Sequence, residues 1–248
     1  MATTGKETEL PLCGTLLDDM DPPAAPGRTE LVFILDRSGS MAGLESDTIG
    51  GYNAMLRRQR EEPGEATVTT VLFSDGHELL HDRIDLRAIR PLTEQEYQVG
   101  GCTALLDTIG HAIGKLMNVQ RHTDARHRAG RVLFVITTDG LENASREFTQ
   151  AQIRTLVERQ KAECGWEFLF LGANIDAIDT AKQFGIHASR AVNYNADPRG
   201  LQVSYDTLCE AVSEFRSCGV VAEDWKAPIE SDHMARSRKT KRYGMGNA

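Results

Sequence analysis

The sequence predicts an α/β protein in which a doubly wound, mostly parallel sheet lies between two layers of helices. Residues 31–35 and 132–136 are continuous apolar runs, and each ends close to an aspartate, Asp36 and Asp139. Uninterrupted runs of this length are typical of strands buried on both faces of a parallel sheet. Segments with helical periodicity alternate with these and other strand candidates, which indicates right-handed crossover connections and a three-layer architecture.

Four further segments have strand character, at residues 67–73, 77–84, 166–171 and 191–194. The dipeptide Asp75-Gly76 separates the first two of them and is a strong hairpin signal. Residues 77–84 are also more polar than the other candidates. We therefore expect this segment to form an antiparallel strand at one edge of the sheet.

Helices are expected between the strands. One amphipathic helix begins near Thr103, because apolar residues recur after it at helical spacing. Residues 149–152 resemble a capping box that starts a second helix. Asn174 is expected to cap a third helix that stops at Gly185, and residues 206–215 supply a last one.

The 248 residues suit one domain with a tail at each end. Residues 1–27 end in a stretch rich in proline and glycine and are interpreted as a flexible N-terminal arm. Residues 28–218 hold the alternating pattern and form the predicted domain. From residue 219 onward the alternation is lost, so residues 219–248, with the basic stretch 236–242, are interpreted as a C-terminal tail.

Composition is that of an ordinary soluble protein, with 40% hydrophobic and 26% charged residues. The net charge of −8 argues against a general nucleic-acid binder, which needs a basic surface. No apolar run approaches the roughly 20 residues that span a bilayer, and the first residues do not resemble a signal peptide, so a cytoplasmic location is expected. The five cysteines have no Cys-x-x-Cys spacing and are expected to be reduced thiols, not zinc ligands.

Oxygen-bearing side chains follow the two buried strands. Asp36, Ser38 and Ser40 alternate directly after the first strand, Thr103 stands at the start of a helix, and Asp139 follows the second strand. The carboxyl ends of parallel strands meet at one edge of a sheet, where ligands bind in open α/β folds. A small hard cation such as Mg²⁺ prefers six oxygen ligands and usually retains waters. Five side chains would leave part of that shell open to an outside ligand.

This set of residues resembles the metal-ion-dependent adhesion site (MIDAS) of von Willebrand factor A (vWA) domains. That resemblance implies a Rossmann-like sheet with one antiparallel edge strand. It also implies direct metal ligation by Ser38, Ser40 and Thr103, with Asp36 and Asp139 acting largely through water. Residues 101–107, 139–145 and 170–177 are more closely similar to a small stand-alone bacterial and phage subgroup. The resemblance covers about residues 30–215, and it departs from the familiar pattern at Cys102, where serine is more usual.

The expected function is a non-enzymatic protein-binding module that depends on Mg²⁺ or Mn²⁺. The metal would capture an Asp or Glu of an unknown partner protein, with no specific nucleic acid and no membrane involved. A lone Asp-x-Ser-x-Ser is usually a helix cap, but the Thr103 and Asp139 elements in the expected order favour a metal site.

Two other classes of function stay open. A metal-assisted phosphoryl hydrolase would use Asp36 as its nucleophile, but residue 38 is a serine and not a second acid, and no phosphate-binding loop is present. A scaffold would bind anionic surfaces through residues 236–242 and keep the metal site for structure only. Cys102 lacks a neighbouring base that would activate it as a nucleophile.

Overall fold

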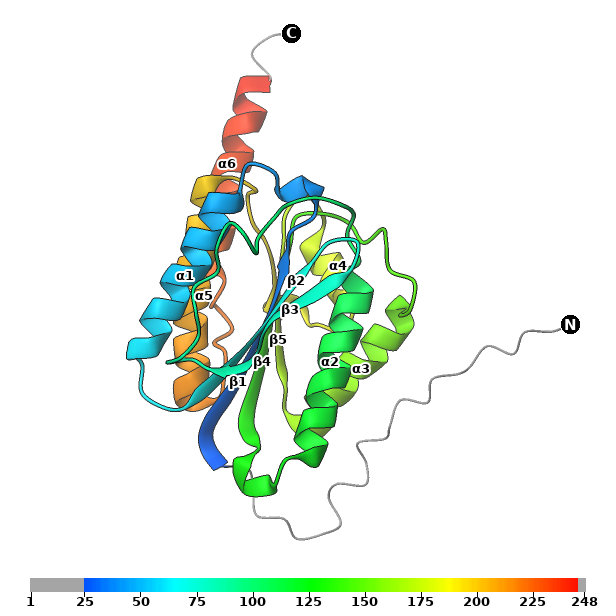
Figure 1. Cartoon of the computed structure of the whole chain (residues 1–248). Coiled ribbons are helices and arrows are strands. Elements are labelled where there is room, and N and C mark those ends of the chain that lie inside the picture. Colours follow the sequence, from blue (N-terminus) through cyan, green and yellow to red (C-terminus); the bar gives the residue numbers. More distant parts are fainter. Residues whose placement is uncertain (1–24, 245–248) are drawn as a thin grey trace, which may run out of the picture.

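The computed structural model describes residues 25–244, which form one six-stranded sheet in the order β3-β2-β1-β4-β5-β6. Neighbouring strands are parallel except β2 and β3, which are antiparallel and place β3 at one edge, as predicted. The strands are β1 (Ala25–Asp36), β2 (Ala66–Phe73), β3 (His77–Asp85), β4 (Ala129–Thr138), β5 (Glu167–Gly172) and β6 (Ala191–Asn193). The predicted fold class is confirmed (Figure 1).

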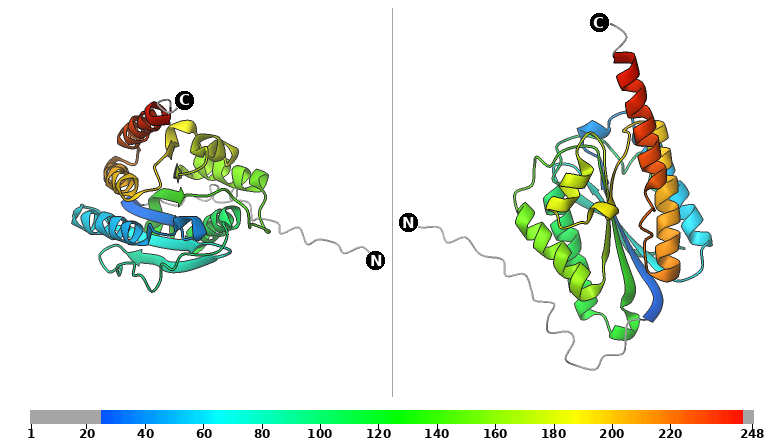
Figure 2. Two further views of the ribbon diagram at one scale, coloured as in Figure 1. Left: turned by 90° about the horizontal axis from the view of Figure 1, so that it is seen from above. Right: turned by 180° about the vertical axis from the view of Figure 1, so that it is seen from behind.

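Helices cover both faces of the sheet and make three layers (Figure 2). One face carries α1 (Glu45–Glu61), α5 (Pro198–Cys218) and α6 (Ala227–Gly244), and the other carries α2 (Leu105–His122), α3 (Gln150–Cys164) and α4 (Ala177–Gln183). Short 3₁₀ turns follow β1 (Gly39–Met41), α2 (Ala125–His127) and α4 (Ala188–Arg190). None of the helices within residues 25–244 is both long enough and apolar enough to cross a membrane.

The central strands divide their side chains between two cores. In β1, Leu31, Phe33 and Leu35 belong to the core beneath α1, α5 and α6, whereas Val32 and Ile34 belong to the core beneath α2, α3 and α4. Successive side chains of a strand point to opposite faces, so a strand covered on both sides must be apolar throughout. This is why residues 31–35 read as one continuous apolar run.

Of the two predicted helix caps, one is present in the structure and the other is replaced by a different residue. The Thr149 side chain accepts a hydrogen bond from the Gln152 backbone N–H, and the Gln152 side chain accepts one from the Thr149 N–H, which confirms the capping box. By contrast, α4 is capped by Asp176, whose Oδ1 lies 3.0 Å from the Asp179 nitrogen. Asn174 has a positive φ of 54° and lies in the preceding turn, so it does not cap this helix.

The C-terminal segment differs most from its interpretation as a tail. Helix α5 is longer than the predicted residues 206–215, and α6 follows it and packs against α5 and β6. Val221, Trp225 and Ile229 are buried in the core beneath these helices, and Trp225 Nε1 donates to the carbonyl oxygen of Ser189 at 2.8 Å. Because apolar side chains after residue 218 enter the core, the folded unit extends beyond the predicted boundary.

The N-terminal boundary of the folded domain differs less from its predicted position at residue 28. Strand β1 starts at Ala25, so residues 25–27 of the predicted arm belong to the sheet. Residues 1–24 lie outside the described part of the chain.

Candidate metal centre

The two strand-end aspartates lie side by side because β1 and β4 are hydrogen-bonded neighbours, with Leu35 paired to Thr137. Asp36 Oδ2 accepts a hydrogen bond from Thr138 Oγ1 at 2.6 Å and lies 3.4 Å from the Asp139 nitrogen. Both aspartates are 1% exposed. Two carboxylates are thus buried at the carboxyl edge of the sheet, which no core-packing requirement explains.

The turn after β1 brings both serine hydroxyls to these carboxylates. The Ser38 backbone nitrogen donates to Asp36 Oδ1 at 2.7 Å, which bends the chain back toward the strand end. Ser38 Oγ lies 2.9 Å from Ser40 Oγ, and Ser40 Oγ in turn donates to Asp139 Oδ1. Asp36, Ser38, Ser40 and Asp139 therefore form one continuous hydrogen-bonded group.

Thr103 reaches the same place from the loop before α2 and is 3% exposed. Its backbone nitrogen donates to Asn143 Oδ1 at 2.8 Å, and the Asn143 nitrogen donates to its carbonyl oxygen at 3.1 Å. A Cβ atom added at Gly140 would lie 3.3 Å from Ser40 Oγ and 3.4 Å from Thr103 Oγ1. The structure therefore brings together all five side chains that the sequence singled out.

One oxygen of this group has no hydrogen-bond partner. Asp139 Oδ2 is buried and unpartnered, whereas both carboxylate oxygens of Asp36 accept hydrogen bonds. Burial raises the pKa of Asp139, and the negative charge of Asp36 raises it further, while the Ser40 hydroxyl lowers it. A buried carboxylate oxygen without a donor is costly, and a cation is the group that would best compensate it.

The chemistry of the donor set fits a hard cation. The described residues contain no cluster of three or more His, Cys, Asp or Glu side chains that could hold a metal ion, so a soft-metal site of that kind is not found in residues 25–244. Here two carboxylates and three hydroxyls supply oxygen only. Oxygen ligands with few charges suit Mg²⁺ or Mn²⁺.

A second layer of side chains, recognised only partly from the sequence, anchors the loop after β4. Glu142 accepts from the backbone nitrogens of Leu106 and Ala144 at 2.8 and 2.9 Å, which ties the loop to the first turn of α2. Asn143 and Glu142 thus both accept hydrogen bonds from backbone nitrogens at or just before the start of α2. Asp107 was missed, although its carboxylate accepts from the backbone nitrogens of residues 146, 147 and 148. An acid in the first turn of a helix was the available signal, but its partners lie about forty residues away in the chain.

Cys102 is exposed beside the centre and contacts Asp75, whose Oδ1 accepts from the Cys102 backbone nitrogen at 2.8 Å. A hydrogen bond between the thiol and the Asp75 side chain raises the pKa of the thiol, and the negative charge of Asp75 raises it further. A raised pKa lowers the thiolate fraction at neutral pH, so the surroundings do not activate Cys102 as a nucleophile.

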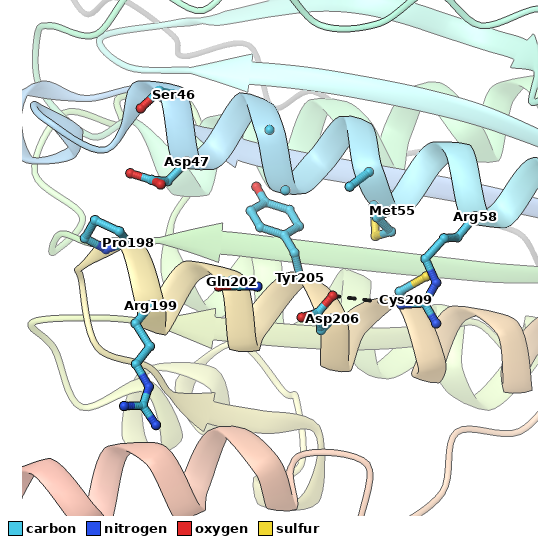
Figure 3. A pocket seen from close by; sticks show the side chains of 13 residues that line it. Ser46, Asp47, Met55, Arg58, Pro198, Arg199, Gln202, Tyr205, Asp206 and Cys209 are labelled. Atoms are coloured by element: carbon cyan, nitrogen blue, oxygen red, sulfur yellow. Dashed lines mark ion pairs between the residues drawn. The ribbon is translucent and has the colours of Figure 1, made fainter.

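A separate groove of about 540 Å³ lies between α1 and α5 (Figure 3). Its lining includes the small or apolar residues Gly50, Gly51, Ala54 and Met55 of α1, and Tyr205 of α5. Four charged residues line it, Asp47, Arg58, Arg199 and Asp206, and of these Arg58 and Asp206 lie 3.9 Å apart as an ion pair. The groove is lined by none of the five oxygen-bearing residues of the candidate centre, so it is a different place.

Solved structures share this architecture. A "von Willebrand factor type A" protein from Catenulispora acidiphila matches with a TM-score of 0.51 and 14% identity, over 75% of this chain and 42% of that one. The chain has a vWA fold. Proximal thread matrix protein 1 from the mussel byssus, in a structure whose MIDAS motif is occupied by zinc, matches with a TM-score of 0.52 and 13% identity, over 75% and 46%. No protein-family model and no curated protein matches the sequence.

At these identities the likeness concerns the fold. The chain matches less than half the length of either solved structure. Within the vWA fold of this chain, the candidate centre lies at the carboxyl ends of β1 and β4, the two central strands. This is the edge at which sequence reasoning placed it.

Proposed function

We propose that this chain is a non-enzymatic binding module that holds Mg²⁺ or Mn²⁺ and uses it to capture an acidic side chain of a partner protein. Ser38, Ser40 and Thr103 would ligate the cation directly, and Asp36 and Asp139 would act largely through water. A bound cation would supply an open coordination position for a carboxylate.

The observation that carries the proposal is the unpartnered, buried Oδ2 of Asp139 beside three convergent hydroxyls. The fold itself gains nothing from a buried oxygen that lacks a donor. Of the five side chains only Ser40 is exposed, so an outside ligand would approach the cation from the side of Ser40.

The comparison with the mussel protein supports a metal at this position of the fold. That structure has zinc in its MIDAS motif, so a protein of similar fold can hold a divalent cation in such a motif. We prefer Mg²⁺ or Mn²⁺ for this chain because its five donors are all oxygens, whereas zinc in proteins favours nitrogen and sulfur.

The arrangement favours binding over hydrolysis. Both oxygens of Asp36 accept hydrogen bonds, from the Ser38 nitrogen and from Thr138, which makes this carboxylate a poor nucleophile. Residue 38 is a serine, so a second acid that could protonate a leaving group is lacking at that position. A metal-assisted phosphoryl hydrolase is therefore the less supported alternative.

The test compares Thr103→Ala with Thr155→Ala, a matched loss of an exposed threonine hydroxyl on α3. By titration calorimetry we expect the wild type and Thr155→Ala to bind Mn²⁺ and Mg²⁺ with the same affinity. Thr103→Ala should bind at least roughly tenfold more weakly, as is common when a ligand or its immediate support is removed. The fold of all three proteins should survive chelation, because the sheet packs without the metal.

Three results would contradict the proposal. The first is equal metal affinity in Thr103→Ala and the wild type. The second is cooperative unfolding of the wild type on chelation, which would make the metal structural. The third is metal-dependent hydrolysis of p-nitrophenyl phosphate that Thr103→Ala removes, which would favour the hydrolase.

A further inference from the structure

An exposed leucine stands directly beside the candidate metal centre. Leu141 is 66% exposed, the highest value among the exposed large hydrophobic side chains of the described residues. Single exposed apolar residues are common on protein surfaces, so exposure alone has no functional meaning. The position of Leu141 and the anchoring of its backbone are what indicate a function.

The position of Leu141 is fixed by its neighbour. Gly140 lies so close to the centre that a Cβ atom there would be 3.3 Å from Ser40 Oγ and 3.4 Å from Thr103 Oγ1. Consecutive Cα atoms are about 3.8 Å apart, so Leu141 is one residue step from Gly140, the residue that lies against these two hydroxyls. Its exposed side chain is therefore carried by the segment that borders the candidate centre.

The segment that carries Leu141 is held on both sides. Asp139, two residues before it, is hydrogen-bonded to Ser40, and Asn143, two residues after it, is bonded to the backbone of Thr103. Glu142 ties the same segment to α2 and to the Ala144 nitrogen. The side chain is thus presented on an anchored backbone, which reduces the ordering cost of a contact made through it.

We propose that Leu141 determines which acidic segments the module accepts. The preferred partner segment presents a carboxylate to the cation and, one or two residues away, an aliphatic or aromatic side chain that packs on Leu141. We expect this short spacing in the peptide because Leu141 directly follows Gly140, which lies against the hydroxyls of the centre. This inference rests on the proposed function, since it needs the metal-bound carboxylate as its anchor.

The test uses a phage-displayed library of random peptides, panned on the full chain in Mn²⁺ and eluted with EDTA. The comparison is between the wild type, Leu141→Ser and Val220→Ser. Val220 is 57% exposed and follows Gly219, which lies against Arg131 near the start of β4, at the opposite end of the sheet. We expect the wild type and Val220→Ser to enrich peptides with an acid flanked by an apolar residue, and Leu141→Ser to enrich the acid alone.

A second measurement gives the size of the effect. A synthetic peptide taken from the wild-type selection should bind Leu141→Ser roughly tenfold more weakly, which corresponds to about 1.4 kcal/mol. Leu141→Met should restore the affinity, because methionine supplies a similar apolar surface. Mn²⁺ binding should be unchanged in both variants.

The outcomes separate the two proposals. If no acidic peptide is eluted by EDTA from the wild type, both the proposed function and this inference are wrong. If acidic peptides are enriched without an apolar neighbour, or if Leu141→Ser keeps the wild-type preference, only the role of Leu141 is overturned. Enrichment of polyacidic peptides alone would point to a purely electrostatic site and would also overturn it.

Discussion

Two parts of this molecule bury polar groups in opposite ways. Around α5 and α6, polar groups are bonded while apolar side chains fill the core: Trp225 Nε1 donates to the carbonyl oxygen of Ser189, and Nζ of the half-buried Lys226 donates to two carbonyl oxygens at 2.8 and 2.9 Å. At the carboxyl edge of the sheet, Asp139 is just as buried, but its Oδ2 has no donor.

This difference in hydrogen bonding helps to separate structural polar groups from candidate functional ones. A polar group that is buried and fully bonded stabilises the structure and needs no further explanation. Several neutral hydroxyl and amide atoms are also buried without a partner, but Asp139 Oδ2 is the one carboxylate oxygen among such atoms of residues 25–244. An unbonded carboxylate is the most costly of these groups to bury, so a cation that supplies the missing interaction explains it better than packing does. If this distinction is right, substitutions in the helical layer affect stability, and substitutions at the strand ends affect metal binding.

The largest expected effect is at Trp225. Trp225→Ala should lower the free energy of unfolding by about 3 to 5 kcal/mol, since it leaves a cavity where a buried aromatic ring had packed. Denaturation in urea measures this. Met234→Ala, at a 53% exposed position of the same α6, should change stability by less than about 0.5 kcal/mol. If Trp225→Ala were as stable as the wild type, the segment after residue 218 would be the tail that the sequence first suggested.

Alanine substitutions at two adjacent glycines of α1 should change the stability in opposite directions. A Cβ atom at Gly51 would overlap the ring of Tyr205 on α5, whereas one at Gly50 meets nothing within 4 Å. Gly51→Ala should therefore destabilise by about 1 to 3 kcal/mol through overpacking. Gly50→Ala should stabilise by about 0.5 to 1 kcal/mol, because alanine favours the helix. Thermal unfolding of both variants checks the pair, and a stabilising Gly51→Ala would show that α1 and α5 are not closely packed there.

The sequence predicted the strands well and the helices on one face poorly. Buried strands such as β1 and β4 leave an uninterrupted apolar run, a signal that depends only on local sequence. Helix α1 was not predicted, because Gly50 and Gly51 interrupt its pattern, and the reason for Gly51 is contact with Tyr205, more than 150 residues away in the chain. In α6, only Ile229 is buried among residues 227–236, for which burial is described, and one buried residue does not outweigh a polar sequence.

The same limit applies to the site. The five oxygen-bearing residues could be found because strand ends at one edge must meet, and that requirement follows from topology. The anchoring of the loop by Asp107 and the missing partner of Asp139 Oδ2 depend on three-dimensional neighbours. Leu141 could not be recognised, since nothing local distinguishes an exposed leucine from a buried one.

Substitutions of the two aspartates of the candidate centre compare a fully bonded carboxylate, Asp36, with a partly unbonded one, Asp139. Asp139→Asn should leave the metal-free protein as stable as the wild type or more stable, because it removes a buried charge that lies next to Asp36. Asp36→Asn should destabilise by about 1 to 3 kcal/mol, because both of its oxygens accept hydrogen bonds. Both variants should lose the stabilisation by Mn²⁺, which is about 1.4 kcal/mol for the wild type at ten times its Kd. Equal destabilisation of the two metal-free variants would contradict the distinction between them.

The smallest expected effect is a pH dependence of the contact between α5 and α6. Asp197 caps α5 through the Gly200 nitrogen at 2.8 Å and pairs with Arg236 of α6. Burial raises its pKa, but the hydrogen bonds from Arg236 and Gly200 outweigh burial, so the pKa in the folded protein lies below the usual 3.8. A depressed folded-state pKa contributes stability above pH 3.8, and that contribution is lost as the pH falls through the folded-state value.

Asp197→Asn isolates this contribution, because asparagine keeps the helix cap and removes only the charge. At pH 7 the variant should be less stable than the wild type by a few tenths to about 1 kcal/mol, the range for a partly exposed ion pair. The difference should shrink in 1 M NaCl and vanish below the folded-state pKa, where the wild-type carboxyl is protonated as well. Unfolding curves of both proteins, recorded from pH 7 downward through the acid range, measure it. A difference that does not decrease as the pH falls would show that Asp197 acts through its cap and not through its charge, and that the ion pair does not help to hold α6 on α5.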